Sequence, residues 1–165
     1  MSAKACALAV SAVLLSALSA SAQPTRVKQF EAWGVYSYGN GSNKSCYALS
    51  VPTTALPASV NHGDNFFLVA PQAGASSYMP QAIMAYDLKA DSRITLTIGN
   101  ETFTLVPKDK TAWVRDPARE PALVAAMRGG SDMTLKATSA RGTNTSYTYS
   151  LKGVTAALQA VRSCR

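Results

Sequence analysis

The stretch Arg93–Val114, RITLTIGNETFTLVPKDKTAWV, decides which class of fold this chain can adopt. From Ile94 to Ile98, large aliphatic residues alternate with threonines, which is the two-residue period of a half-buried strand. Gly99-Asn100 then offers a two-residue turn with glycine in first position, as a type II′ hairpin requires. After residues 107–110, the run Thr111–Val114 can return along the hairpin, so we predict a meander of three strands.

The turn also predicts the register of the hairpin. The expected cross-strand pairs are Ile98 with Glu101, Leu96 with Phe103, and Ile94 with Leu105. Large apolar residues then meet on one face and threonines pair on the other, which is the arrangement that stabilises neighbouring strands. This meander indicates a β-rich domain, but it carries no chemistry.

Residues 1–22 have the features of a cleaved signal peptide. Lys4 provides the positive start, Ala7–Leu18 is the apolar segment, and Ala20-Ser21-Ala22 supplies small residues for cleavage after Ala22. The alternative is a transmembrane anchor, but the apolar segment is too short to span ~30 Å of hydrocarbon. We therefore expect an exported, periplasmic chain in which residues 23–165 form one domain without a transmembrane segment, with secretion as a further option.

Two cysteines remain after signal removal, Cys46 and Cys164. An even number in an exported protein predicts one disulfide, which would join an early strand to the last helix; two free thiols are the alternative. The chain has a single histidine and no close cysteine pair, so we expect neither a metal site nor a cofactor.

Other segments with strand-like or helix-like patterns complete the predicted fold. The expected strands are Phe30–Tyr36, Ser45–Ser50, Asn65–Ala70, Gln81–Tyr86, Met133–Ala137 and Thr145–Leu151, where a short helix is the alternative for Gln81–Tyr86. The expected helices are Pro121–Arg128 and one whose apolar stripe is Val154, Ala157, Leu158 and Val161. Short connections between many strands favour a mainly β, antiparallel β-sandwich with one or two short helices. Trp33 and Trp113 are expected in its core, and a platform for stacking a sugar ring is the alternative.

Motifs for catalysis are missing from the sequence. There is no phosphate-binding loop, no Gly-x-Ser-x-Gly elbow and no His-Glu-x-x-His helix. His62 lies in the turn-like run Asn61–Asp64 and is expected to be solvated, although a hydrolase that uses His62 with a serine or a carboxylate remains a rival hypothesis. We assign no catalytic residue.

The mature chain is basic, which suggests contact with anionic partners. Of 16 basic and 9 acidic side chains only Lys4 is lost with the signal peptide, which leaves a net charge of +6. The candidate surface consists of Lys108, Lys110, Arg115 and Arg119, interleaved with Asp109, Asp116 and Glu120. The candidate ligands are anionic lipid headgroups, lipopolysaccharide phosphates or acidic glycans. The alternative is that the positive charge only keeps the protein soluble. No nucleic-acid-binding pattern is present.

Several short runs occur in a characteristic order: Trp33–Val35, Lys44–Ser50, Thr95–Gly99, Ala112–Val114, Ala126–Gly130, Tyr149–Gly153, Ala157-Leu158 and Cys164. Together they resemble the bacterial invasion-associated locus B family over nearly the whole mature chain. The resemblance implies an immunoglobulin-like β-sandwich, export to the periplasm and no enzymatic activity, and it supplies no catalytic residues. The expected function is surface binding, as an envelope or host-interaction factor; a purely structural envelope protein is the alternative.

Overall fold

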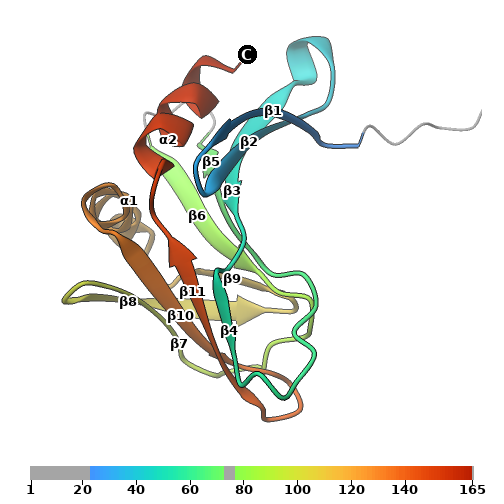
Figure 1. Ribbon diagram of the computed structural model, residues 1–165, viewed down its shortest axis with the longest axis vertical. Coiled ribbons are helices and arrows are strands. Elements are labelled where there is room, and N and C mark those ends of the chain that lie inside the picture. The colour runs from blue at the N-terminus through green and yellow to red at the C-terminus, as the bar shows by residue number, and fades with distance from the viewer. Residues whose placement is uncertain (1–22, 73–76, 165) are drawn as a thin grey trace, which may run out of the picture.

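The computed structural model describes residues 23–72 and 77–164, and the predicted signal peptide lies outside them. The described chain is mainly β, with two α-helices and two short 3₁₀ turns (Figure 1). The strands are β1 (Thr25–Phe30), β2 (Trp33–Tyr38), β3 (Ser45–Ser50), β4 (Thr54–Leu56), β5 (Phe66–Pro71), β6 (Tyr78–Ile83), β7 (Ile94–Ile98), β8 (Glu101–Lys108), β9 (Thr111–Val114), β10 (Asp132–Thr138) and β11 (Asn144–Ser150). The helices are α1 (Glu120–Gly129) and α2 (Val154–Ser163), and the 3₁₀ turns are η1 (Gly41–Asn43) and η2 (Pro117–Arg119).

The described strands form one antiparallel sheet in the order β1-β2-β3-β5-β6-β9-β8-β7-β10-β11-β4. This sheet is open, with β1 and β4 at its edges. The prediction of a mainly β, antiparallel fold with one or two short helices is confirmed, and the described chain has two. None of the helices in the described ranges is long and apolar enough to cross a membrane.

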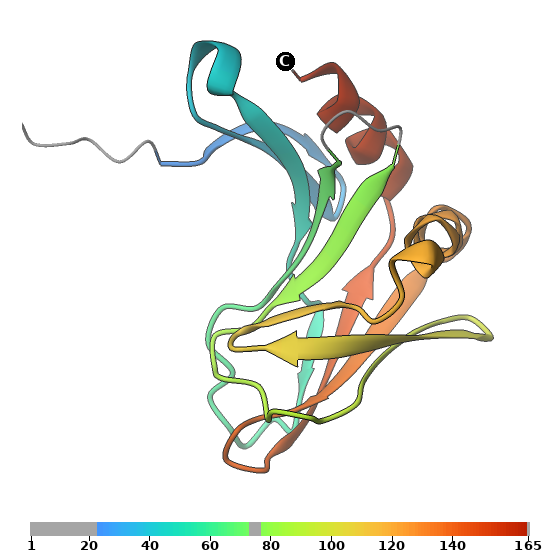
Figure 2. The ribbon, with the colours of Figure 1, turned by 180° about the vertical axis from the view of Figure 1, so that it is seen from behind.

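The sheet bends strongly, so that its two halves face each other around a common core (Figures 1 and 2). Phe67 of β5 meets Tyr149 of β11 edge to face, with ring centroids 5.9 Å apart, although these strands are not neighbours in the sheet. Trp33 Nε1 of β2 donates a hydrogen bond to the carbonyl oxygen of Ser150, 2.9 Å away. The bend therefore gives one continuous sheet the packing of a sandwich.

The predicted meander is present as β7, β8 and β9. The register between β7 and β8 is the one that the turn predicts: Ile94 opposite Leu105, Leu96 opposite Phe103, and Ile98 opposite Glu101. Gly99 has a φ of 54°, which glycine adopts without steric cost at the first position of a type II′ turn. β9 then pairs with β8 from Val114 to Thr111.

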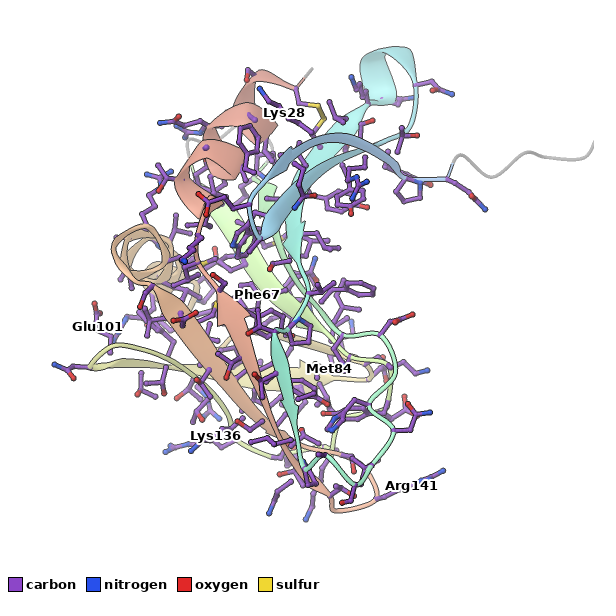
Figure 3. All side chains as sticks on the ribbon, viewed as in Figure 1. Lys28, Phe67, Met84, Glu101, Lys136 and Arg141 are labelled. Carbon is purple, nitrogen blue, oxygen red and sulfur yellow. A yellow bond between two sulfur atoms is a disulfide. The ribbon has the colours of Figure 1, made fainter. Side chains whose placement is uncertain are left out.

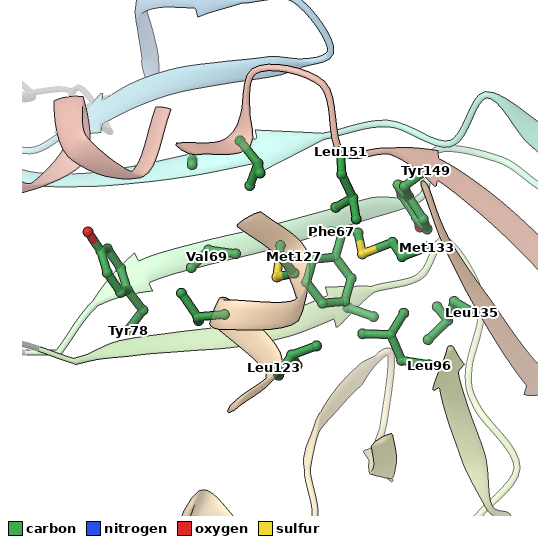
Figure 4. Packing of buried hydrophobic residues seen from close by; sticks show 14 of the residues in the cluster. Phe67, Val69, Tyr78, Leu96, Leu123, Met127, Met133, Leu135, Tyr149 and Leu151 are labelled. Atoms are coloured by element: carbon green, nitrogen blue, oxygen red, sulfur yellow. The ribbon is translucent and has the colours of Figure 1, made fainter. Parts of the chain in front are cut away.

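The core combines the inner faces of both sheet halves with the apolar faces of both helices. Leu123 and Met127 of α1 belong to the same buried cluster as Phe67 and Leu96 (Figure 4). The predicted stripe of α2 is buried in full: Val154, Ala157, Leu158 and Val161 are each at most 2% exposed. This helix contacts β1, β2, β3 and β5, and the predicted disulfide joins its end to β3, with a Cα–Cα distance of 6.0 Å between Cys46 and Cys164.

The prediction of a single strand over Phe30–Tyr36 is wrong. Glu31, with a φ of 48°, lies in a tight turn between β1 and β2, and Phe30 pairs with Trp33 across it. The strand predicted over Gln81–Tyr86 is β6, which begins earlier, at Tyr78, and ends at Ile83. The edge strands β1 and β4 have no predicted counterpart, because their largely exposed residues lack a clear apolar alternation.

Candidate functional site

Three chain segments meet at the end of the sheet where the β8–β9 and β10–β11 turns lie. Backbone hydrogen bonds join the segment after β6 to the β8–β9 turn: the Met84 N–H donates to the Lys110 carbonyl at 2.8 Å, and the Leu88 N–H donates to the Asp109 carbonyl at 2.9 Å. The Ala140 N–H in the β10–β11 turn donates to the Asp87 carbonyl at 2.7 Å. We call this region, residues 84–89, 108–111 and 138–143, the turn cluster.

A hollow of about 560 Å³ opens on the turn cluster, and we call it the Trp113 hollow. Its lining consists of Asp87, Lys108, Asp109, Lys110, Thr111 and Trp113. Trp113 Nε1 donates to Thr111 Oγ1 at 3.0 Å, and Thr111 Oγ1 donates to the Lys108 carbonyl at 2.8 Å. This chain of bonds lays the indole along its own strand and fixes it there.

The predicted core position of Trp113 is wrong. Its neighbours Ala112 and Val114 are the buried residues of β9, so Trp113 lies on the opposite face and is only half-buried. Trp33, by contrast, is fully buried as predicted. Both faces of β9 carry apolar residues, Trp113 on one and Ala112 and Val114 on the other. The alternation pattern alone therefore does not predict which face is buried.

The lysines of the Trp113 hollow are available to a ligand. Lys108 and Lys110 are exposed, and within the described residues neither side chain has a carboxylate oxygen within 4.0 Å. Asp109 between them, with a φ of 54°, forms the tight turn that places both lysines at the end of the β8–β9 hairpin. Two cations and two carboxylates, Asp87 and Asp109, thus surround one half-buried indole.

A second hollow of about 530 Å³, the His62 hollow, adjoins the first and shares Asp87 and Lys110 with it. Arg141 and His62 add further polar groups to its wall. Arg141 projects from the tip of the β10–β11 turn (Figure 3) and, among the described residues, has no ion-pair partner. The sequence contained no signal for Asp87 or Arg141, because only the pairing of distant segments brings them to Lys110.

His62 is held by a hydrogen-bond chain that leads into the core. Its Nε2 lies 3.0 Å from the Pro57 carbonyl oxygen, which can only accept, so Nε2 is the donor. Its Nδ1 lies 2.8 Å from the Tyr147 hydroxyl, which lies 3.2 Å from the Tyr86 hydroxyl. Burial, together with the Tyr86 hydrogen bond, raises the pKa of Tyr147, so its phenol remains protonated. Both ring nitrogens of His62 are therefore engaged by a tyrosine and a backbone carbonyl.

The four predicted basic residues do not form one surface. Arg115 and Arg119 line a separate hollow of about 260 Å³ at the other end of β9. The Arg119 guanidinium lies 5.0 Å from the centroid of the Phe103 ring, so part of its charge already interacts with an aromatic face. Lys110 and Arg115 are separated by about 16 Å along the strand, roughly twice the Debye length of ~8 Å at physiological salt.

In residues 23–72 and 77–164, no three His, Cys, Asp or Glu side chains gather closely enough to hold a metal ion. What the two shallow hollows offer instead is a fixed aromatic ring, carboxylates, and cations that have no ion-pair partner among the described residues. Such an arrangement can hold a polar ligand by stacking, ion pairing and hydrogen bonding.

The fold defines a small, mainly β protein whose terminal helix is joined to the sheet by a disulfide. The family described as invasion associated locus B (IalB) protein matches residues 33–162, and the chain belongs to that family. The structure is also similar to the crystal structure of invasion associated protein B from Bartonella henselae, with a TM-score of 0.58 and 16% sequence identity. That similarity covers 82% of this chain and 95% of the other, and at this identity it concerns the fold alone. A search of curated proteins found no match.

Proposed function

We propose that this chain is an exported, non-enzymatic binding protein that contacts anionic groups of the cell envelope or of a host surface through Lys108 and Lys110. The observation that carries the proposal is the position of these two lysines: exposed, without a carboxylate partner in the described chain, and at the rim of a hollow. Arg141 in the adjoining hollow adds a third cation, which likewise has no ion-pair partner within residues 23–72 and 77–164.

Two features support export to the periplasm. Residues 1–22 have the sequence pattern of a signal peptide. The Cys46–Cys164 disulfide is of the kind that persists in oxidising compartments and is rare in the cytosol.

The hydrogen bonds of His62 support a binding role over hydrolysis. A catalytic histidine needs one nitrogen that faces its nucleophile and another that faces its orienting group. Both nitrogens of His62 are instead engaged by Tyr147 and by the Pro57 carbonyl, neither of which is a serine or carboxylate. We therefore expect His62→Ala to leave anion binding at Lys108 and Lys110 unchanged.

Cosedimentation with lipid vesicles tests the anion-binding proposal. We expect the mature protein to bind phosphatidylglycerol-containing vesicles at low salt and not pure phosphatidylcholine vesicles. The binding should fall steeply towards physiological ionic strength, because exposed charges are screened beyond a Debye length of ~8 Å. Reversal of both lysines, Lys108→Glu with Lys110→Glu, should abolish it. Binding that is absent at low salt, or insensitive to salt, would mean that the basic residues serve solubility only.

A further inference from the structure

We infer that the Trp113 hollow binds a sugar ring that carries a single carboxylate, so that the natural ligand is an acidic oligosaccharide of the uronate type. This inference rests on the proposed function, since Lys108 and Lys110 would supply its cationic contacts. It goes further by assigning the indole of Trp113 and the two aspartates of the hollow to the same ligand.

The balance of charge in the hollow argues against a dense polyanion. Lys108 and Lys110 are matched there by Asp87 and Asp109, so the hollow has two charges of each sign. For a ligand with closely spaced phosphates, repulsion by the two carboxylates would offset much of the attraction by the two lysines. A ring with one carboxylate and several hydroxyls fits better, because the carboxylate can pair with a lysine while the hydroxyls donate to the aspartates.

The fixed indole supplies the flat apolar surface that a sugar ring requires. The hydrogen bond from Trp113 Nε1 to Thr111 holds the ring along β9, so little conformational freedom is lost when a ligand stacks on it. An aromatic face carries partial negative charge, which attracts the weakly positive C–H groups on one side of a pyranose. An acyclic phospholipid headgroup such as phosphatidylglycerol has no corresponding flat apolar face, and for this reason we favour the sugar.

The dimensions of the two hollows suit a short oligosaccharide. The Trp113 hollow is a shallow surface depression of about 560 Å³, on which a single sugar ring can lie with one face against the protein. The His62 hollow lies beside it, since Asp87 and Lys110 line both hollows. A neighbouring sugar in the same chain could therefore meet Arg141 with its own carboxylate.

Intrinsic fluorescence tests the inference directly, because the chain contains two tryptophans and Trp33 is fully buried. Titration with trigalacturonate at low salt should change the emission of Trp113 and saturate. An uncharged galactose trisaccharide should bind at least tenfold more weakly, since it lacks the charge-assisted contact with the lysines. Equal responses to both sugars, or none to trigalacturonate, would overturn the inference.

Two variants separate sugar binding from general anion binding, with affinities measured by calorimetry. Trp113→Ala should lower the affinity for trigalacturonate at least tenfold and leave vesicle binding unchanged. Trp113→Phe should keep part of the affinity for the sugar, because it keeps an aromatic face.

Asp87→Ala should weaken trigalacturonate binding, because it removes an acceptor for the sugar hydroxyls. It should strengthen vesicle binding, because it also removes a negative charge that repels the anionic surface.

The outcomes distinguish the inference from the proposed function on which it rests. Vesicle binding without a response to trigalacturonate would overturn the sugar assignment and leave anion binding standing. If Asp87→Ala strengthened the binding of both ligands, the hollow would be a simple cationic patch, which also contradicts the inference. If neither ligand bound at low salt, both proposals would fail.

Discussion

Two tyrosines on the inner face of β11 show how much the partner of a single hydroxyl matters. Tyr147 and Tyr149 are both fully buried. The Tyr147 hydroxyl is hydrogen-bonded to His62 and Tyr86, whereas the Tyr149 hydroxyl has no hydrogen-bond partner among the described residues. Burial raises the pKa of both phenols, so both remain neutral at physiological pH.

This contrast predicts opposite effects of the same chemical change. Tyr149→Phe should raise the free energy of unfolding by up to about 1 kcal/mol, because it removes a buried hydroxyl whose desolvation is not compensated. Tyr147→Phe should lower it by about 1–2 kcal/mol, because His62 and Tyr86 lose a partner. Urea denaturation of the two variants beside the wild type gives both values. A larger loss for Tyr149→Phe than for Tyr147→Phe would contradict this assignment of hydrogen bonds.

At the scale of elements, the close approach of α2 to the β1–β2 hairpin depends on Gly153. This residue precedes the helix with a φ of 86°, and a Cβ there would collide with the carbonyl oxygen of Phe30. Gly142, in the β10–β11 turn, has a similar φ of 88° but open space around it. The two glycines thus share a backbone conformation and differ in packing.

Alanine at these two glycines separates the effect of conformation from that of packing. Gly142→Ala should cost about 1–2 kcal/mol of stability, the usual penalty for a left-handed alanine. Gly153→Ala should cost clearly more, because α2 and the β1–β2 hairpin must also move apart. Chemical denaturation measures both losses. Similar losses would show that Phe30 does not constrain the start of the helix.

The disulfide stabilises the same helix at its other end. Cys46 and Cys164 are 118 residues apart, so the bond closes a long loop, for which the chain-entropy model gives about 4–5 kcal/mol. Reduction should lower the thermal midpoint by several degrees, since ~1 kcal/mol moves the midpoint of a domain of this size by a few degrees. Alkylation of the unreduced, denatured protein provides the check. Recovery of two free thiols would rule out the bond.

The elements that sequence reasoning recovered are those specified by local signals. The β7–β8 register follows from one glycine turn and a strict alternation, and the α2 stripe follows from helical spacing. The β1–β2 turn was not predicted, because Glu31 and Ala32 are not typical turn-forming residues. The tertiary fold holds Glu31 at a positive φ.

The candidate site was only partly predictable, for a related reason. Lys108 and Lys110 stand out in the sequence because they flank a turn beside a strand. Their separation from Arg115 and Arg119 follows from the length of β9, and their meeting with Asp87 and Arg141 follows from backbone pairing between distant turns. Contacts of this kind leave no local pattern.

At the scale of the whole molecule, the account requires that residues 1–22 be removed on export. Mass spectrometry of periplasmic material should find Gln23 at the N-terminus, open or cyclised. Gln23 and Pro24 are exposed and precede β1, so a processed end at Gln23 costs no buried contact. Detection of an intact Met1 in the periplasmic fraction would contradict the predicted cleavage.

The central claim is that binding depends on the position of the lysines rather than on the net charge of the molecule. A matched control exists, because neither Lys44 nor Lys152 belongs to the turn cluster: Lys44 follows η1, and Lys152 lies between β11 and α2, at the end of β11 opposite to the β10–β11 turn. Lys44→Glu with Lys152→Glu changes the net charge by the same amount as Lys108→Glu with Lys110→Glu.

The most direct measurement is therefore the affinity of these two double variants and the wild type for trigalacturonate and for phosphatidylglycerol vesicles at one low salt concentration. Thermal midpoints of all three proteins confirm that each is folded. The account predicts that the Lys108/Lys110 variant loses binding to both ligands while the Lys44/Lys152 variant keeps most of it. Equal losses in the two variants would contradict it, since binding would then follow net charge and not the site.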